Sequence, residues 1–577
     1  MRHPHNVTSM RRNRLKTNRD YLGWLFALAI GGAAAEAIVL QALGFVSALP
    51  LAPQLSAPAP FGVFHDVRWV WTYAWSWPSV AWQLIALLVF RSLFDTLLIA
   101  AAWPHGTARR PSFATLWRRS AFYVAAAIVI MSPWATLTFA AGALSFGWFM
   151  LAAIIASILI ALVMPHGIIT GEWWRRIAPW RTMPYIIAAW VALMLEALAI
   201  TFSPPWFTVV IAAAGGAINA LLWRRIVVSV VEAGAPRYTI PVTPLAVTAI
   251  IGVFIAGGAY VYGTSRHSGN PKATANAGQL ARISNIGNYS ATSQPAIIFV
   301  SGFGSRYDGR PRQLLGPLAS VWYYSYNGLG ADGRPRPYAP EDTHQSLAKS
   351  ARLLAQQVER LHEVTSHLVT VIAESEGTMV ARMYFAKYAN PPVDRYIQSS
   401  PLIRPSRVYY PPAGQDGFGL VAGWEIREIL RLAQLENPTF SIHADLPFLR
   451  SMVDQAPLLR DQTLCPIPGV KTFMFLPLEA AMMAERGALS RIRWAALPGW
   501  HATLLSRGTV QSDIHHLLQT GKLPHRPGWA FGFQLIRGAA TAWQSPALPL
   551  RFPPWRAAPG SDPAFGGYRC SSAHASG

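Results

Sequence analysis

The chain has 577 residues and a formal net charge of +22, with 52% hydrophobic and only 13% charged residues. This composition excludes a disordered chain and a collagen-like or disulfide-rich fold, and it is too apolar for an ordinary soluble protein. The excess of 49 Lys and Arg over 27 Asp and Glu could by itself indicate nucleic-acid binding, so the positions of the positive charges have to decide.

Apolar segments that are long enough to cross a bilayer dominate the first 265 residues. A membrane-spanning helix needs about 20 predominantly apolar residues. Seven segments are close to this length: 21–45, 80–103, 120–142, 146–164, 183–202, 206–222 and 245–263. The long apolar stretch around Leu144 contains Pro133 and could be divided differently. We therefore predict a basic tail over 1–20 and a region of about seven transmembrane helices over 21–263.

Basic residues gather in alternate connections between these segments, as cytoplasmic loops require. The N-terminal tail and the second, fourth and sixth loops hold Arg2, Arg11, Arg12, Arg14, Lys16, Arg19, Arg109, Arg110, Arg118, Arg119, Arg175, Arg176, Arg181, Arg224, Arg225 and Arg237. The other loops hold only Arg68. This pattern predicts a multi-pass plasma (inner) membrane protein with a cytoplasmic N-terminus and an extracytoplasmic C-terminal half. We then expect the positive charge to contact anionic membrane lipid or cell-envelope polymer, with no nucleic acid as a partner.

Two features of the predicted membrane region depart from plain hydrophobic helices. The first outer loop is rich in tryptophan, which favours the headgroup boundary and predicts an interfacial segment at Trp69, Trp71, Trp75, Trp77 and Trp82. Ionisable residues fall within the predicted spans at Glu36, Arg91, Asp95 and Glu196. These groups form either structural ion pairs, Arg91 with Asp95 for example, or part of a proton, ion or lipid pathway.

Composition changes after the seventh segment, where residues 264–293 are rich in Ser, Gly, Asn and Ala and are typical of a flexible linker. Short apolar runs then alternate with amphipathic stretches over 294–535, which predicts an α/β domain with a mostly parallel sheet. The expected strands are 296–300, 321–326, 368–373, 395–398, 472–476 and 492–496. The expected helices are 345–362, capped by Asp342 or Thr343, 378–388, 424–435 and one after His501.

The segment HLVTVIAESEGTMVA, over 367–381, reads as a strand, a tight turn with Ser375 at its apex, and a helix. Ala373 and Gly377, two positions on either side, are small enough for the strand and helix to approach each other. Here the chain resembles the α/β-hydrolase superfamily, whose pattern is Gly-x-Ser-x-Gly, with Ala373 in place of the first glycine. The resemblance covers residues 295–518 and implies that Ser375 is a catalytic nucleophile.

The same resemblance implies an acid and then a histidine, each after a later strand. Glu479 and His501 follow the strands expected at 472–476 and 492–496, although Glu485 is a second candidate for the acid. The family also uses two backbone N–H groups as an oxyanion hole. The positions that match are Glu376, which follows the nucleophile, and Phe303, with Gly302 and Gly304 shaping its loop. Negative charge on Glu374 and Glu376 would disfavour anionic substrates unless these side chains point away.

Three further segments complete the expected organisation. Residues 402–468 form an insertion rich in Pro, Tyr, Phe and Leu, which is either a cap over an apolar substrate or a packing insertion. Residues 536–577 read as a tail rich in Pro, Gly and Ser. The two cysteines, Cys465 and Cys570, either pair in an oxidising compartment or remain free thiols.

The sequence therefore predicts a membrane-anchored serine hydrolase, esterase- or lipase-like, that cleaves an acyl ester at the outer membrane–water boundary. The expected partners are membrane lipid and an acyl ester that is lipid-linked or envelope-linked; no cofactor and no metal are expected, since no metal-ligand or nucleotide-binding spacing is present. Two alternatives remain open. One is an acyltransferase with the same catalytic residues, and the other is a binding or transport protein with an inactive hydrolase domain.

Overall fold

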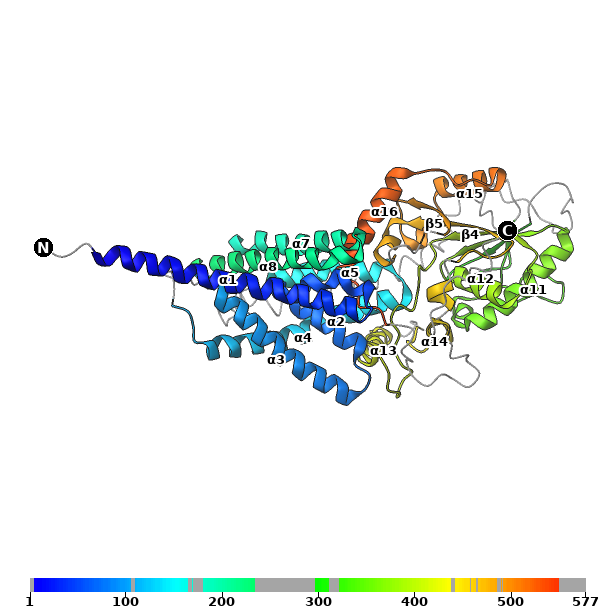
Figure 1. Cartoon of the computed structure of the whole chain (residues 1–577). Coiled ribbons are helices and arrows are strands. Elements are labelled where there is room, and N and C mark those ends of the chain that lie inside the picture. The colour runs from blue at the N-terminus through cyan, green and yellow to red at the C-terminus, as the bar shows by residue number, and fades with distance from the viewer. Residues whose placement is uncertain are drawn as a thin grey trace.

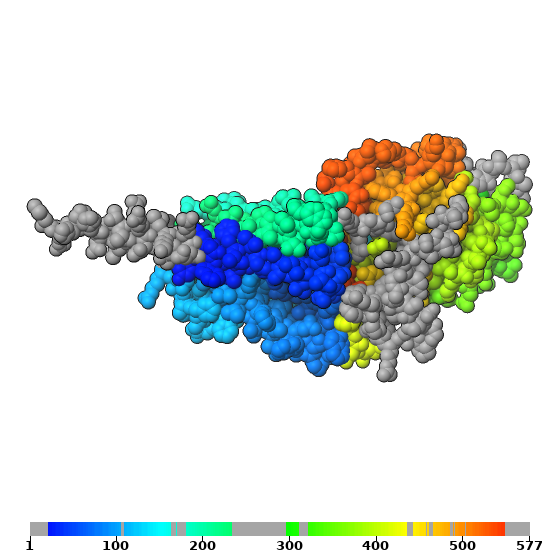
Figure 2. All heavy atoms as spheres, viewed as in Figure 1, coloured from blue at the N-terminus to red at the C-terminus, as the bar shows by residue number. Residues whose placement is uncertain are grey.

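The computed structural model describes residues 5–104, 109–163, 169, 180–233, 296–310, 321–436, 442–456, 458–462, 465–484, 489 and 491–548. A bundle of long helices forms one part of the molecule, and a helix-covered sheet forms the other (Figure 1). The molecule as a whole is elongated (Figure 2). The segments predicted over 245–263 and 264–293 lie outside the described residues.

In the part of the chain that the structure describes, the bundle contains six long helices: α1 (His5–Ala42), α3 (Trp77–Ala102), α4 (Phe113–Leu144), α5 (Gly147–Val163), α7 (Met183–Phe202) and α8 (Thr208–Glu232). Among the described residues, five of these helices, all except α5, contain a segment that is long and apolar enough to cross a membrane. α5 is a shorter apolar helix of 17 residues. Five of the seven predicted spans thus correspond to helices of sufficient length, and α4 and α5 divide the stretch around Leu144 near the expected place.

The connection between the first two predicted spans packs inside the bundle. It forms a 3-10 helix, η1 (Val46–Ser56), and a short α-helix, α2 (Phe61–Tyr73), which packs on α4. Trp71 is only 4% exposed, whereas Trp75, Trp77 and Trp82 are at least half exposed. Of the tryptophans expected at an interface, Trp71 is therefore a packing residue of α2, while Trp75, Trp77 and Trp82 keep exposed rings and the interfacial role stays a prediction for them.

Buried charges in the bundle form a network that connects three helices. Arg91 of α3 donates from Nε and Nη2 to the two carboxylate oxygens of Asp66 at 2.6 and 2.8 Å. His65 lies between Asp66 and Glu36, with 2.8 Å contacts to both. Asp95, the partner expected for Arg91, is farther away at 3.6 Å. The main ion pair of Arg91 is thus with a residue on another helix.

The C-terminal half contains a six-stranded sheet in the order β2-β1-β3-β4-β5-β6, with every neighbouring pair parallel. The strands are β1 (Ala296–Val300), β2 (Val321–Tyr323), β3 (Val369–Glu374), β4 (Val393–Ser399), β5 (Lys471–Pro477) and β6 (Arg493–Leu497). All six strands overlap the ranges that the sequence predicts. β1 and the buried part of β5 are the continuous apolar runs typical of strands that are buried on both faces.

Helices cover both faces of this sheet. α11 (Leu347–Thr365) and α12 (Glu376–Lys387) share a core with one face, and α15 (Gly508–Thr520) shares a core with the other. The cap of α11 is Ser346, whose side chain accepts from the N–H of Lys349, and not the expected Asp342 or Thr343. Those two residues belong to a separate 3-10 turn, Pro340–His344. The expected α/β architecture is present as a three-layer fold.

The insertion over 402–468 joins the two parts of the molecule. Its helix α13 (Leu420–Glu436) packs on α2 and α4, and its helix α14 (Pro447–Asp454) packs on α11. Glu425 of α13 accepts hydrogen bonds from Ser132 and Thr136 of α4 and from Trp71 of α2. The insertion therefore holds the sheet to the bundle.

The boundary expected at 535/536 falls inside a helix, α16 (Pro527–Ala540), which packs on α7. The chain that follows α16 enters the bundle, where Trp543 is fully buried beside Phe61 and Trp190. Arg68, also fully buried, donates to the carbonyl oxygens of Ala542 and Gln544. Residues 541–548 thus belong to the packed structure, because their apolar side chains complete the core of the bundle.

Candidate active site

Ser375 occupies a sharp turn between β3 and α12, with φ 51° and ψ −120°. A non-glycine residue with positive φ is strained, and such strain often marks a functional site. A Cβ atom at Gly377 would lie 2.2 Å from the carbonyl oxygen of Val300, so only glycine lets α12 start this close to β1. Ala373 is fully buried beside Val300 in the sheet. Ala373 and Gly377 thus both lie where the sequence predicts that a small residue is required for β3 and α12 to approach each other.

His501 reaches Ser375 from the loop after β6. Its Nε2 lies 2.7 Å from the Ser375 hydroxyl oxygen, which is hydrogen-bonding distance. Burial lowers the pKa of His501 to about 4, because a buried imidazole loses the hydration that stabilises its charged form. The imidazole is therefore neutral at pH 7 and can accept the proton of the serine hydroxyl.

Glu479 follows β5 and lies beside His501. Its Oε1 accepts a 2.5 Å hydrogen bond from the backbone N–H of His501, while Oε2 has no partner among the described residues. Burial raises the pKa of Glu479 to about 7, against the opposite effect of that N–H bond. The carboxyl group thus fixes the backbone of His501, and no described group hydrogen-bonds to the second ring nitrogen. Glu485 lies outside the described residues.

The loop after β1 lies directly against the nucleophile. A Cβ atom at Gly302 would lie 2.8 Å from the Cβ of Ser375, so this loop can approach only because residue 302 is glycine. The Gly304 N–H donates to the Thr343 hydroxyl at 3.0 Å. The Phe303 ring stacks on His344 and on Phe448 of α14, with centroids 4.8 and 5.2 Å away.

Two backbone N–H groups near Ser375 are available to a substrate. Within the described residues, the N–H groups of Phe303 and Glu376 form no hydrogen bond. Glu376 is the first residue of α12, where N–H groups have no partner inside the helix. These are the two residues that the family resemblance in the sequence implies as oxyanion donors.

Glu374 and Glu376, on either side of Ser375, do not provide the negative charge that the sequence suggests for this site. Burial raises the pKa of Glu374 to about 8 and raises that of Glu376 well above its ordinary value. The Glu376 side chain is fully buried. Both groups are protonated at pH 7, since desolvation penalises the carboxylate form.

The bundle contributes residues to this site that sequence reasoning missed. The ring of Phe146, at the α4–α5 junction, meets the His501 ring edge-on with centroids 5.2 Å apart. Trp148 stacks on Trp500 at 5.0 Å. A Cβ atom at Gly147 would lie 2.6 Å from the carbonyl oxygen of Glu479. The start of α5 therefore packs against the loops that carry His501 and Glu479, and no local motif around residue 146 indicates this contact.

The cysteines and possible metal ligands lie as follows. Cys465 is disulfide-bonded, and Cys570, the other cysteine in the sequence, lies outside the described residues. Within the part of the chain that the structure describes, no group of three or more His, Cys, Asp or Glu side chains is arranged to hold a metal ion.

Comparisons with known proteins find neither a matching family model nor a matching curated protein. Among solved structures, a hydrolase from Oleispira antarctica matches with 14% identity and a TM-score of 0.25. An esterase from Exiguobacterium antarcticum matches with 16% identity and a TM-score of 0.24. Each match covers 40% of this chain and 92% of the other chain. Both neighbours are hydrolases, but similarity at this level does not define the chemistry of this chain.

Proposed function

We propose that the protein is a membrane-embedded serine hydrolase that cleaves an acyl ester. The observation that carries this proposal is the 2.7 Å contact between neutral His501 and the strained Ser375 hydroxyl at the carboxyl end of a parallel strand. Labelling of the intact protein by a fluorophosphonate, which reacts with an activated serine, tests it directly.

Each residue has a defined role in the proposed reaction. His501 Nε2 takes the proton as the Ser375 oxygen attacks the ester carbonyl, and it then gives the proton to the leaving alcohol. The N–H groups of Phe303 and Glu376 bind the oxyanion that forms. Water, activated by the same histidine, releases the acid from the acyl-enzyme. Glu479 holds the His501 backbone and, when ionised, stabilises the imidazolium.

The arrangement of the bundle supports the topology expected from the loop charges. At one end, which we call the basic end, Arg224 of α8 donates to Ala102 O at 2.5 Å and the Arg110 guanidinium lies 5.6 Å from the Tyr21 ring centroid. At the other end, which we call the domain end, Trp77 of α3 contacts Trp424 of α13.

α8 runs from the domain end, at Thr208, to the basic end. The topology expected from the loop charges includes a seventh span over 245–263, which lies outside the described residues. The α/β domain then lies outside and the N-terminus inside, with the bundle in the plasma membrane.

A membrane-lipid acyl ester is the substrate class that fits this placement. Phe146, Gly147 and Trp148 lie at the domain end of the bundle and touch the residues around His501 and Glu479. The candidate site is thus built against the end of the bundle, where a lipid ester group lies when the helices span a bilayer. A lipid substrate would therefore have little distance to travel from the bilayer.

The pH dependence of hydrolysis should contain two rises. Activity requires neutral His501, whose pKa of about 4 places the first rise there. Glu479, with a pKa of about 7, ionises at the second rise and its charge then stabilises the imidazolium. We expect Glu479→Gln to keep the first rise, lose the second, and lower kcat about tenfold at pH 8. The exposed Glu363→Gln is the matched control. An unchanged second rise in Glu479→Gln would exclude Glu479 from this role.

Phe146 should act as a positioning residue for His501. Phe146→Ala removes the ring that packs on the imidazole, which is worth about 0.5–1.5 kcal/mol, so we expect a three- to tenfold fall in kcat. Water reaching the ring should raise the pKa of His501 and move the lower rise upward. Phe146→Leu should restore both properties, and Phe113→Ala, an exposed position on α4, is the control. A fall in kcat with no movement of the pH profile would contradict the positioning role.

A further inference from the structure

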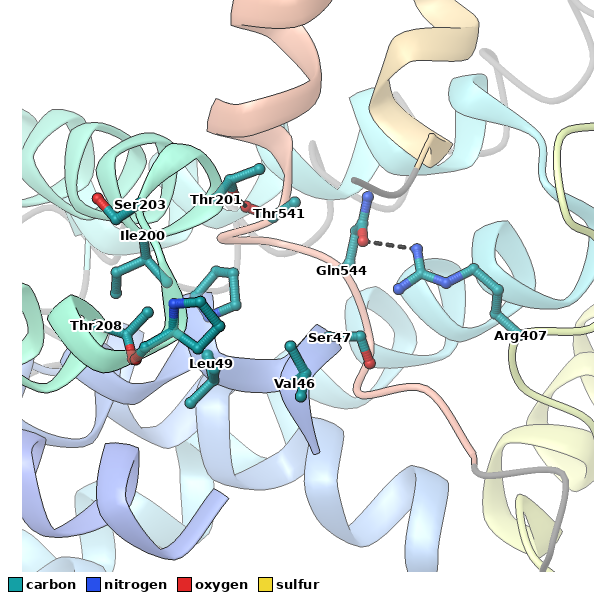
Figure 3. A pocket seen from close by; sticks show the side chains of 12 residues that line it. Val46, Ser47, Leu49, Ile200, Thr201, Ser203, Thr208, Arg407, Thr541 and Gln544 are labelled. Atoms are coloured by element: carbon teal, nitrogen blue, oxygen red, sulfur yellow. Dashed lines mark hydrogen bonds between the residues drawn. The ribbon is translucent and has the colours of Figure 1, made fainter. Parts of the chain in front are cut away.

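A cavity lies at the domain end of the bundle. Its volume is about 260 Å³, and it is enclosed by η1, the end of α7, the start of α8 and the segment that follows α16 (Figure 3). Arg407, from the insertion, also lines it. Neither Ser375, His501 nor Glu479 does, so the cavity is separate from the candidate active site.

Arg407 gives the cavity its charge. It is the one charged side chain among the lining residues, it is only 3% exposed, and no carboxyl group lines the cavity. Its Nη1 donates to Gln544 Oε1 at 2.6 Å, and Gln544 Nε2 in turn donates to the carbonyl oxygen of Met482 at 2.6 Å. The guanidinium is therefore held in place by its neighbours, as Figure 3 shows. A fixed, buried guanidinium suits phosphate or carboxylate.

Hydroxyl groups in the wall differ in what they can offer a ligand. Thr201, Ser203, Thr208 and Thr541 each donate to a backbone carbonyl oxygen three or four residues earlier. Ser47 makes no such bond within the described residues and is exposed at the wall. Ser47 thus adds a hydroxyl to the same wall as the Arg407 charge.

The surroundings of the cavity are those of a membrane–water boundary. Val46, in its wall, is 58% exposed. Phe202 and Trp206, which are next in the sequence to the lining residues Thr201 and Pro205, are 47% and 73% exposed. Exposed aromatic residues at the end of an apolar bundle are typical of the headgroup level. A ligand here therefore meets one fixed positive charge and an apolar border.

We propose that this cavity binds the phosphodiester headgroup of an anionic phospholipid, with the phosphate on Arg407. The volume is below the roughly 300–1,000 Å³ of sites for drug-sized ligands, which suits a small headgroup whose acyl chains remain outside. A zwitterionic headgroup fits less well, because its ammonium group would find no carboxylate in the wall. This proposal does not depend on the proposed hydrolysis.

Binding of diether phosphatidylglycerol to the purified full-length protein in detergent tests the proposal, because ether lipids cannot be hydrolysed at the candidate active site. We expect Arg407→Gln and Ser47→Trp each to raise the Kd at least tenfold. Ser47→Trp blocks the cavity from an exposed position, so it tests the site even where Arg407→Gln fails to fold. Arg431→Gln, at a 72% exposed side chain of the same insertion, and Ser506→Trp, at an exposed serine outside the cavity, are the matched controls.

The outcomes separate the ligand classes. An unchanged Kd in Ser47→Trp would overturn the cavity as the site. Diether phosphatidylcholine binding as tightly as phosphatidylglycerol would overturn the requirement for an anionic lipid. Displacement of the lipid by inorganic phosphate at equal concentration would show that the cavity takes a free anion and would overturn the lipid assignment.

Discussion

We expect the Ser375→Ala variant to lose fluorophosphonate labelling completely and to hydrolyse acyl esters at least about 10⁴-fold more slowly than the native protein. The reason is that the hydroxyl oxygen, 2.7 Å from His501 Nε2, is the atom that forms the acyl-enzyme in the proposed reaction. Alanine removes that oxygen without adding bulk at the turn. The residual rate would come from substrate binding and the two N–H groups alone.

The measurement uses membranes that contain the intact protein, so that the bundle and the α/β domain remain in contact. Ser506→Ala, at an exposed serine after β6, controls for non-specific loss and should be labelled like the native protein. Labelling of Ser375→Ala at the native level would place the reactive serine elsewhere. A folded native protein that is not labelled would favour the alternative of a binding or transport protein with an inactive hydrolase domain.

The second large effect should come from the buried ion pair of the bundle. We expect Asp66→Asn to lower the free energy of unfolding by about 3 kcal/mol, because the nearly isosteric amide leaves the Arg91 charge buried without its closest carboxylate. Arg91 is only 2% exposed, so water cannot replace that partner. Asp95, at 3.6 Å, compensates only in part.

Denaturant unfolding in detergent, followed by a spectroscopic signal of the helices, measures this effect. Asp332→Asn is a matched control, because Asp332 and its partner Arg334 are both more than half exposed and surface pairs contribute little. Equal stability of Asp66→Asn and the native protein would show that the network around Arg91 is not structural. The alternative of a proton, ion or lipid pathway, which the sequence leaves open for Glu36, Arg91, Asp95 and Glu196, would then gain weight.

The nature of the insertion, left open by its composition, follows from its contacts. Phe448 of α14 touches Phe303 near the candidate oxyanion donors, while α13 packs on α2 and α4. The apolar residues of the insertion therefore serve chiefly to bury surface between the sheet and the bundle. The same interface brings Arg407 to the cavity at the end of the bundle.

The sequence by itself determined the strands, most of the helices and the turn at Ser375, because each is encoded by a local pattern. Apolar runs, helical periodicity and small residues two positions from the serine are all readable within about 20 residues. The contact of His501 with Ser375 was predicted only through a family resemblance. The distance between His501 Nε2 and the Ser375 oxygen depends on how the strands and loops pack. The lowered pKa of the imidazole and the raised pKa values of Glu374 and Glu376 depend on burial, which no local pattern gives.

Only the tertiary structure decided which distant segments meet. Phe146 on His501, Asp66 on Arg91, and Trp543 inside the bundle join residues that are 25 to several hundred positions apart. An apolar side chain can be buried against any surface of complementary shape, and a buried charge can pair with any opposite charge within reach. The sequence therefore says that such residues need partners, and the packing of the helices and the sheet selects them.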